Sequence, residues 1–196
     1  QTCALPILDV GHGDWKMWRD FKFDNIDYTG IDVVSELSRQ LNCEFGREGR
    51  VFRAEMNSDF LGSSNQLIIC KDVLQHLSNS KVMEYLNKFS RSKYLIVCND
   101  IYVKPNRLSL IKGLILKVLI KGKVVFPFSE FRSKVSLNNS EIEDGGLRGV
   151  DLQAQPFREL MQNLELVSTF DFHAPKRFGL VKRVQFFRQL SSMQAN

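Results

Sequence analysis

The sequence predicts an α/β fold: a doubly wound, mostly parallel sheet with helices on both faces and a C-terminal antiparallel β pair. Two observations carry this prediction. Short apolar runs alternate with amphipathic segments through roughly the first hundred residues, and this alternation is typical of parallel sheets covered by helices. The last part of the chain instead holds two β-rich runs, 164–172 and 182–190, which predict the antiparallel pair.

The first predicted strand is the apolar run Ile7–Val10, which stops at the turn Gly11–Gly13. Glycine permits such a tight turn because it has no Cβ atom. Trp15, Trp18 and Phe21 follow at helical spacing, so a helix is expected between the first strand and the second.

A second strand is expected over Tyr28–Asp32 and a third over Val51–Glu55. Between them, Val34, Leu37 and Leu41 recur at steps of three and four and predict a helix. Right-handed crossovers place the C-terminal ends of parallel strands on one edge of the sheet. A ligand site is therefore expected along that edge.

The fourth and fifth strands are predicted over Leu67–Cys70 and Tyr94–Cys98. A helix is expected between them, with Ser78 or Ser80 as its N-cap. Its apolar side is formed by Val82, Leu86 and Phe89. Strand, helix and strand then continue the same doubly wound pattern.

The composition limits the classes of protein to which the chain can belong. With 196 residues, 43% hydrophobic and 25% charged, the chain is expected to form one domain over 1–196. The net charge of +5 favours anionic partners but falls short of a dedicated nucleic-acid binder. The four cysteines show no CxxC spacing, which predicts free thiols, no metal site and a reducing, cytoplasmic compartment.

Three segments have separate interpretations. Residues 1–7 resemble the translation of a DNA-sequencing adapter, and we interpret them as an artefact. Residues 103–157 are expected to form an insertion on the substrate side. Within it, 107–123 is amphipathic with lysines on one side, which fits either a lid on the core or a peripheral contact with anionic lipid. The lysines that interrupt 108–128 exclude an ordinary membrane span.

The residues of the glycine turn indicate which kind of cofactor can bind there. Gly11 and Gly13 allow close approach to the main chain, and Asp32 lies where a strand-end carboxylate could bind two ribose hydroxyls. The third glycine of the dinucleotide fingerprint is replaced by Lys16, which weakens an NAD interpretation. Carboxylates beside the turn, with Asp9 among them, oppose a pyrophosphate and favour a cationic cofactor.

Three motifs in order resemble the class I S-adenosylmethionine-dependent methyltransferases. Asp9–Asp14 is similar to their acidic-x-Gly-x-Gly motif, Gly30–Val33 to their second-strand acidic motif, and Cys70–Leu77 to their Asp-Val-Leu-x-His-Leu segment. The resemblance spans about Ile7 to Ile101. It implies a Rossmann-like methyltransferase fold and S-adenosyl-L-methionine as cofactor.

The resemblance also implies a set of cofactor contacts. Asp32 would hold the ribose hydroxyls and Val33 would cover an adenine face, while Asp9 would order the turn or face the ammonium group through water. Trp15 stands where a glycine is common and could shield the methionine moiety. The remaining implied contacts are Gly11, His12, Gly13 and Asp14 at the turn, Lys71 after the fourth strand, and Glu55, Met56 and Asn57, of which Glu55 and Asn57 compete for the adenine amino group.

Catalysis requires a base only where the acceptor must lose a proton. Asp72 and His76 are the predicted catalytic residues, with Asp100 as a further candidate at the substrate. Each has a structural alternative: Asp72 could bind backbone groups at the turn, and His76 could be a packed or capping residue. Arg148 could bind an anionic substrate or be a solvated surface charge.

Three functions remain open at this point. The first is methyl transfer to an oxygen or nitrogen of a small molecule or glycan; residues 145–157 resemble a segment of a bacterial, glycan-associated subgroup. The second is an RNA or nucleotide methyltransferase, suggested by a basic cluster but disfavoured by the absence of an Asn-Pro-Pro-Tyr-like motif. The third is a non-catalytic binding module that retains the fold. The basic cluster comprises Lys176, Arg177, Lys182 and Arg183.

Overall fold

The computed structural model describes residues 4–54, 66–103, 138–173 and 180–190. Several predictions lie outside these residues. They concern Glu55, Met56 and Asn57 as cofactor contacts, the amphipathic segment 107–123, and the basic pair Lys176 and Arg177.

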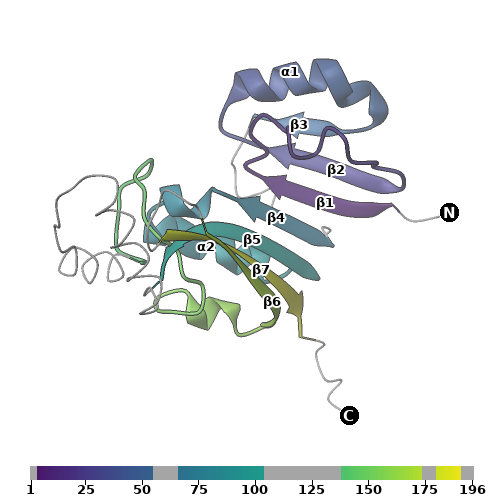
Figure 1. The fold of residues 1–196 in the computed structure, drawn as a ribbon. Helices are drawn as coiled ribbons and strands as arrows, with labels where there is room; N and C mark the ends of the chain where they lie inside the picture. The colour runs from purple at the N-terminus through teal and green to yellow at the C-terminus, as the bar shows by residue number, and fades with distance from the viewer. Residues whose placement is uncertain (1–3, 55–65, 104–137, 174–179, 191–196) are drawn as a thin grey trace, which may run out of the picture.

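The described chain forms one seven-stranded sheet in the order β3-β2-β1-β4-β5-β7-β6 (Figure 1). Strands β1 to β5 are parallel, while β7 runs antiparallel to both β5 and β6. The doubly wound sheet with a C-terminal antiparallel pair is therefore confirmed. The strands are β1 Leu5–Val10, β2 Ile26–Ile31, β3 Val51–Arg53, β4 Leu67–Lys71, β5 Tyr94–Tyr102, β6 Leu164–His173 and β7 Leu180–Gln189.

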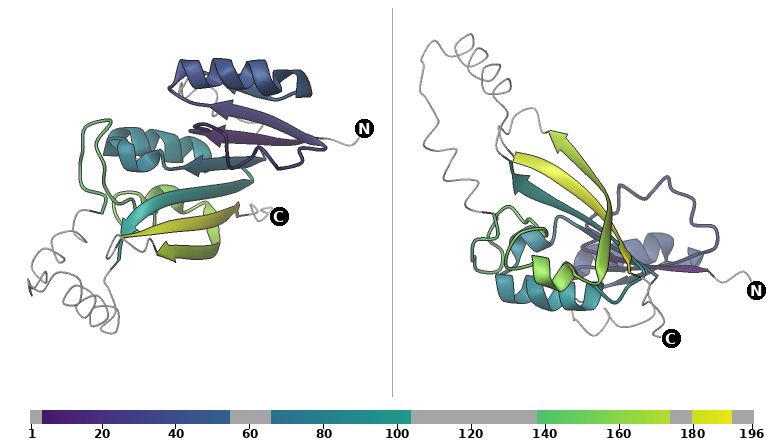
Figure 2. Two further views of the ribbon diagram at one scale, coloured as in Figure 1. Left: turned by 45° about the horizontal axis from the view of Figure 1, so that its top comes forward. Right: turned by 90° about the horizontal axis from the view of Figure 1, so that it is seen from below.

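Helices α1 (Ser35–Phe45) and α2 (Asn79–Phe89) pack on opposite faces of the sheet (Figure 2). Residues alternate between the two faces of a strand. In β1, Leu8 packs in the cluster that contains α2, whereas its neighbour Ile7 packs in the cluster that contains Leu41 of α1. Three short 3₁₀ helices complete the described elements: η1 Gly46–Glu48, η3 Leu74–His76 and η4 Arg158–Met161.

The predicted helix between β1 and β2 is wrong. The chain instead makes consecutive turns, with Trp15 N–H bonded to the His12 carbonyl, Trp18 to Trp15 and Phe21 to Trp18. The aromatic spacing of three matches these three-residue turns rather than the 3.6-residue period of an α-helix. Trp15 also has φ of 57°, a left-handed conformation that interrupts a right-handed helix.

Helix α2 forms where it was predicted, but its N-terminus is capped differently. Ser78 is the N-cap residue, yet its side chain makes no capping bond. The backbone N–H of Ser78 instead donates to Asp144 at 2.9 Å, and that of Asn79 donates to Glu141 at 3.0 Å. Acidic side chains from a distant segment thus satisfy the free N–H groups at the positive end of the helix.

The described part of the predicted insertion, 138–157, runs without regular helix or strand. Its start is tied to the end of β5, because the Asn138 amide both accepts from Tyr102 N–H at 3.0 Å and donates to Tyr102 C=O at 2.8 Å. In the described ranges no helix combines the length and apolar character needed to cross a bilayer. Cys70 and Cys98 are buried free thiols in β4 and β5, as the spacing of cysteines predicted.

Candidate functional site

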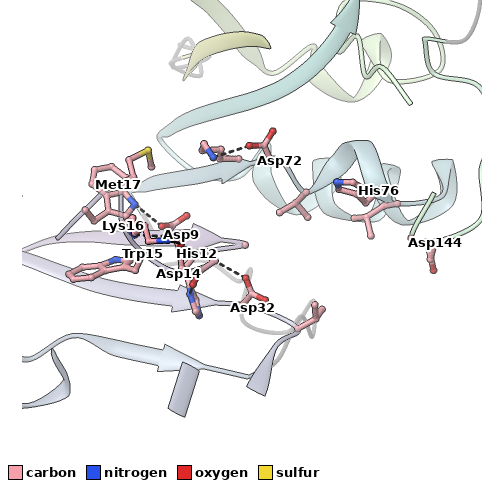
Figure 3. Close-up of a pocket in the computed structure, with 18 of the residues that line it drawn as sticks. Asp9, His12, Asp14, Trp15, Lys16, Met17, Asp32, Asp72, His76 and Asp144 are labelled. Atoms are coloured by element: carbon pink, nitrogen blue, oxygen red, sulfur yellow. Dashed lines mark hydrogen bonds and ion pairs between the residues drawn. The ribbon is translucent and has the colours of Figure 1, made fainter. Parts of the chain in front are cut away.

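A cavity of about 680 Å³ lies at the carboxyl ends of β1, β2 and β4 (Figure 3). This volume falls within the range of small-molecule sites. From β1 the sheet continues to β2 on one side and to β4 on the other, which is the point where ligands bind in open α/β sheets. The cavity is lined by Asp9, Gly11, His12, Gly13, Asp14, Trp15, Lys16, Met17, Trp18, Asp32, Val33, Lys71, Asp72, Val73, His76, Leu77, Lys81, Asp144 and Gly145.

The turn after β1 is built for close packing against the loop after β4. Gly11 has φ of 77°, and a Cβ atom placed on it would lie 2.2 Å from Val73 Cγ2. Its N–H donates to the Ile31 carbonyl at 2.8 Å. Only glycine fits both the conformation and the space at this position.

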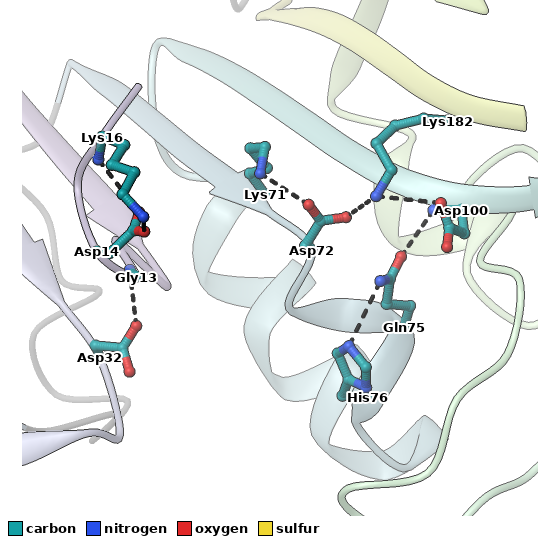
Figure 4. A network of polar contacts seen from close by, with 10 residues as sticks. All are labelled: Gly13, Asp14, Lys16, Asp32, Lys71, Asp72, Gln75, His76, Asp100 and Lys182. Carbon is teal, nitrogen blue, oxygen red and sulfur yellow. Dashed lines mark hydrogen bonds and ion pairs between the residues drawn. The ribbon is translucent and has the colours of Figure 1, made fainter. Parts of the chain in front are cut away.

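Asp32 is held at the end of β2 with both carboxylate oxygens oriented. Its Oδ2 accepts from Gly13 N–H at 3.0 Å and its Oδ1 from Val34 N–H at 2.9 Å (Figure 4). The residue is 8% exposed and lines the cavity. Each oxygen of a carboxylate can accept a second hydrogen bond, so the group can still bind two neighbouring hydroxyls.

Asp9 forms an acidic floor beneath the turn. One oxygen, Oδ2, accepts from both Trp18 Nε1 at 2.9 Å and the Tyr28 hydroxyl at 2.7 Å. Burial raises the pKa of Asp9, and these two hydrogen bonds oppose burial without outweighing it. A cation in the cavity would stabilise the ionised form of this buried carboxylate.

Trp15 supports the turn from below. It is 1% exposed, stacks on Phe23 with 5.5 Å between ring centroids, and makes a tilted contact with Phe45 at 4.6 Å. The Arg50 guanidinium lies 5.1 Å from the Trp15 ring. This aromatic cluster stands where the predicted helix was expected, and apolar burial of this size is among the strongest stabilising contributions a side chain makes.

His12 is buried in the turn. Its Nε2 lies 3.1 Å from Ser38 Oγ and its Nδ1 2.8 Å from the Gly13 carbonyl. A Cβ atom on Gly30 would lie 2.9 Å from the His12 ring. The imidazole is thus packed and hydrogen-bonded inside the protein.

The rim of the cavity on this side is solvent-exposed. Val33, predicted to cover an adenine face, is 72% exposed and lines the cavity. Asp14 is paired with Lys16 at 2.6 Å, and hydrogen bonds from Lys16 lower its pKa. An exposed pair of this kind contributes little to stability.

Asp72 lies beyond β4 between two ammonium groups (Figure 4). Lys71 Nζ is 2.8 Å from Asp72 Oδ2, and Lys182 pairs with Asp72 Oδ1 and lies 3.1 Å from Asp100 Oδ1. Burial acts to raise the pKa of Asp72, but hydrogen bonds from both lysines outweigh it and the pKa is lowered. A carboxylate held in this way is a weak base.

The sequence analysis missed the role of Lys182 and grouped it with a basic cluster. It faces Asp100 because β5 and β7 pair in that register, and strand register across the sheet has no local sequence signal. Arg183, from the same cluster, pairs with Asp171 at 2.7 and 2.8 Å. The two described members of the cluster therefore have acidic partners.

His76 presents one ring nitrogen for chemistry. Its Nδ1 lies 2.8 Å from the Gly146 carbonyl, and a carbonyl only accepts, so Nδ1 carries the hydrogen. In the neutral ring Nε2 then holds the lone pair and accepts a long hydrogen bond, 3.5 Å, from Gln75 Nε2 (Figure 4). His76 lines the cavity on the side opposite the glycine turn (Figure 3).

The two predicted substrate-binding residues lie outside the cavity lining. Asp100 is 6% exposed and contacts Lys182. Arg148 is 2% exposed, so the alternative of a solvated surface charge is wrong. Among the described residues, no group of three or more histidine, cysteine or acidic side chains could hold a metal ion.

Comparison with solved structures identifies the fold. The mitomycin 7-O-methyltransferase MmcR matches 95% of this chain with a TM-score of 0.58 at 14% identity, and this chain spans 49% of MmcR. The magnesium protoporphyrin IX methyltransferase ChlM of Synechocystis PCC 6803, solved with bound SAH, matches 97% with a TM-score of 0.57 at 13% identity, over 76% of its own length. PKMT2 of Rickettsia typhi, in complex with AdoHcy, matches 98% with a TM-score of 0.60 at 12% identity, over 50% of its length.

No family model matches the chain, and no curated protein matches it in sequence. At these low identities the similarity establishes the fold. The chain has the Rossmann-like fold of the class I S-adenosylmethionine-dependent methyltransferases. It spans about half the length of two of the three structures compared above.

Proposed function

We propose that the protein binds S-adenosyl-L-methionine and transfers its methyl group to an oxygen or nitrogen of a small molecule or glycan. The observation that carries this proposal is the Asp32 carboxylate, fixed by Gly13 N–H and Val34 N–H at the edge of the cavity. Structures of the same fold solved with SAM or SAH support the cofactor assignment.

The residues present fit this cofactor. Asp32 has acceptor capacity for a ribose diol, and the glycine turn lets a ligand approach the main chain. The buried carboxylate of Asp9 suits a cationic ligand better than a phosphate. In these roles Gly11, Gly13 and Asp32 hold the cofactor and Asp9 balances its positive charge.

Bound S-adenosylmethionine supplies an electrophilic methyl carbon on a sulfonium. Held by Gly11, Gly13 and Asp32, it would supply this methyl group to an acceptor hydroxyl and would leave as neutral S-adenosylhomocysteine, which keeps the electron pair of the broken carbon–sulfur bond. His76 Nε2 takes the hydroxyl proton, since Nδ1 is already bonded to the Gly146 carbonyl and Nε2 holds the lone pair, which the acceptor hydroxyl reaches by replacing the long contact from Gln75 Nε2. Asp72 stays ionised beside Lys71 and Lys182 and orients the acceptor rather than accepting its proton.

The protein's remaining task is to position the reactants and exclude water. Val73 and Leu77 supply apolar contacts on the β4 side, and the pairs Lys71–Asp72 and Lys81–Asp144 form a polar rim. Polar pairs beside a few apolar contacts suit an acceptor rich in hydroxyl groups, as a glycan is. The acidic partners of Lys182 and Arg183 speak against an RNA acceptor, because paired cations bind phosphate weakly.

Isothermal titration with S-adenosylmethionine, S-adenosylhomocysteine and NAD tests the proposal. Micromolar binding of the first two is expected, reduced by about tenfold or more in Asp32→Ala because two hydroxyls lose a charged partner. Asp27→Ala is the matched control, since Asp27 is an exposed residue on the same strand. If neither S-adenosylmethionine nor S-adenosylhomocysteine binds, the chain is a non-catalytic module. Binding of NAD would contradict the assignment of the cofactor.

A further inference from the structure

Arg148 is a buried cation whose hydrogen bonds all stay within the protein. Its Nη1 donates to Asn79 Oδ1 at 3.0 Å and to the Ser140 carbonyl at 3.1 Å, and its Nη2 donates to the Leu77 carbonyl at 2.9 Å. The guanidinium lies 5.7 Å from the Phe157 ring. These contacts join segment 138–150 to the start of α2.

Burying a guanidinium among neutral acceptors costs free energy, because water is lost and none of its three acceptors is a carboxylate. Burial accordingly lowers the pKa of Arg148, and the charge of Glu141 opposes this effect without outweighing it. Its Nε is buried without a hydrogen-bond partner among the described residues. Because this burial costs free energy, stability alone does not explain an arginine at this position. A role in holding neighbouring groups in place explains it better.

The same segment contacts His76 at two points and the neighbouring Gln75 at a third. The Gly146 carbonyl accepts from His76 Nδ1 at 2.8 Å, and Gly145 N–H donates to the His76 carbonyl at 2.7 Å. Next to His76, the Gln75 carbonyl accepts from the backbone N–H of Arg148 itself at 3.2 Å. Arg148 is only two residues from Gly146, so its side chain sets where that carbonyl lies.

We infer that Arg148 is a positioning residue that fixes the orientation and tautomer of His76. By locking segment 138–150 against Leu77 and Asn79, it holds the Gly146 carbonyl on Nδ1 and leaves Nε2 as the basic nitrogen at the cavity. The inference rests on the proposed function for its catalytic meaning, although the imidazole arrangement can be tested without any methyl acceptor.

Arginine is needed here because its planar fork reaches three acceptors in two directions. A lysine would keep the positive charge but present one ammonium point, and it would hold the segment less firmly. Arg148→Lys is therefore the conservative variant: it keeps the positive charge and removes the hydrogen-bonding geometry of the guanidinium. Asn79→Ala removes one acceptor of Nη1 and is a milder second variant.

The test is NMR of the protein labelled with ¹⁵N-histidine. The chain has three histidines, and His76→Gln assigns the resonance of interest. In the wild type His76 is expected in the Nδ1–H tautomer. In Arg148→Lys and Asn79→Ala the Nε2–H tautomer should appear. Arg158→Lys, an exposed arginine on η4, should leave the tautomer unchanged.

Two outcomes overturn the inference: a wild-type tautomer of His76 in folded Arg148→Lys, or the same result in Asn79→Ala if the arginine variant does not fold. Calorimetry with S-adenosylmethionine is run in parallel. If the wild type fails to bind it while His76 responds to Arg148, the positioning role stands and the proposed methyltransferase function falls.

Discussion

The two halves of the cavity are held together in different ways. The glycine-turn half, residues 9–18 with Asp32, is joined by contacts close in sequence: Trp18 to Asp9 spans nine residues, and Gly13 to Asp32 spans nineteen. The latch half, residues 71–81 with 138–150, depends on partners far apart: His76 to Gly146 spans seventy residues, and Asp72 to Lys182 spans 110.

This difference shows which half of the cavity can be predicted from a local sequence motif. In the glycine-turn half, the hydrogen bonds of the turn join residues that are close in the chain, while its packing also reaches Phe45 and, at Gly11, Val73. In the latch half, charged and polar pairs form only after the sheet and segment 138–150 are in place. Substitutions in the glycine-turn half should therefore destabilise the protein mainly through lost packing. Substitutions in the latch half should destabilise it mainly through lost polar contacts.

The largest expected effect comes from removing the aromatic support of the turn. Trp15→Ala should lower the free energy of unfolding by about 3–5 kcal/mol, the usual cost of truncating a fully buried aromatic side chain. Urea denaturation followed by circular dichroism measures it. Phe21→Ala is the control, since Phe21 is 50% exposed. Equal losses in both variants would show that the cluster does not depend on Trp15.

A second comparison concerns two glycines of the turn, only one of which packs against the loop after β4. Gly11→Ala should cost about 2–4 kcal/mol, because it adds a clash with Val73 to the strain of a positive φ. Gly13→Ala should cost only about 1–2 kcal/mol, since nothing lies within 4 Å of a Cβ atom there and the strain of φ remains. The same denaturation experiment compares them, and equal costs would contradict the close approach of Val73.

Lys182→Met tests the latch half. Asp72 would lose one of two ammonium partners, and the free energy of unfolding at pH 7 should fall by about 1 kcal/mol. The lowered pKa of Asp72 stabilises the fold above the ordinary carboxyl pKa, and this contribution is lost as pH falls through the lowered value. The difference from wild type should thus shrink in acid. Lys22→Met, an exposed lysine, is expected to show no difference at any pH.

The smallest effect concerns the pH dependence of cofactor binding. Asp9 must be ionised to attract a cationic ligand, and burial raises its pKa, with Tyr28, Trp18, His12 and Lys71 acting in the opposite direction. S-adenosylmethionine affinity should therefore decrease by a few-fold as pH falls through that raised value, measured by calorimetry at a series of pH values from neutral downward.

Asp9→Asn supplies the control for this pH dependence. The amide keeps an acceptor for Trp18 and Tyr28 but carries no charge, so its affinity should be low and independent of pH. Its melting temperature should rise at pH 7, because a buried carboxylate with a raised pKa destabilises the fold when ionised. A pH dependence that persists in Asp9→Asn would assign the effect to another group.

The sequence by itself determined the order of strands and helices, the glycine turn and the candidate residues Asp9 and Asp32. These features depend on local apolar periodicity and on glycine, whose effects act over a few residues. The aromatic spacing of Trp15, Trp18 and Phe21 misled, because a period of three suits successive turns as well as a helix.

Only the tertiary structure decided what the charged residues do. Lys182 meets Asp72 and Asp100 through the register of β7 on β5, and Arg148 is buried because segment 138–150 folds over the start of α2. Strand register and the path of an irregular segment are set by the packing of the whole sheet. Periodicity along the chain carries no signal for them, since each contact joins residues about seventy or more positions apart.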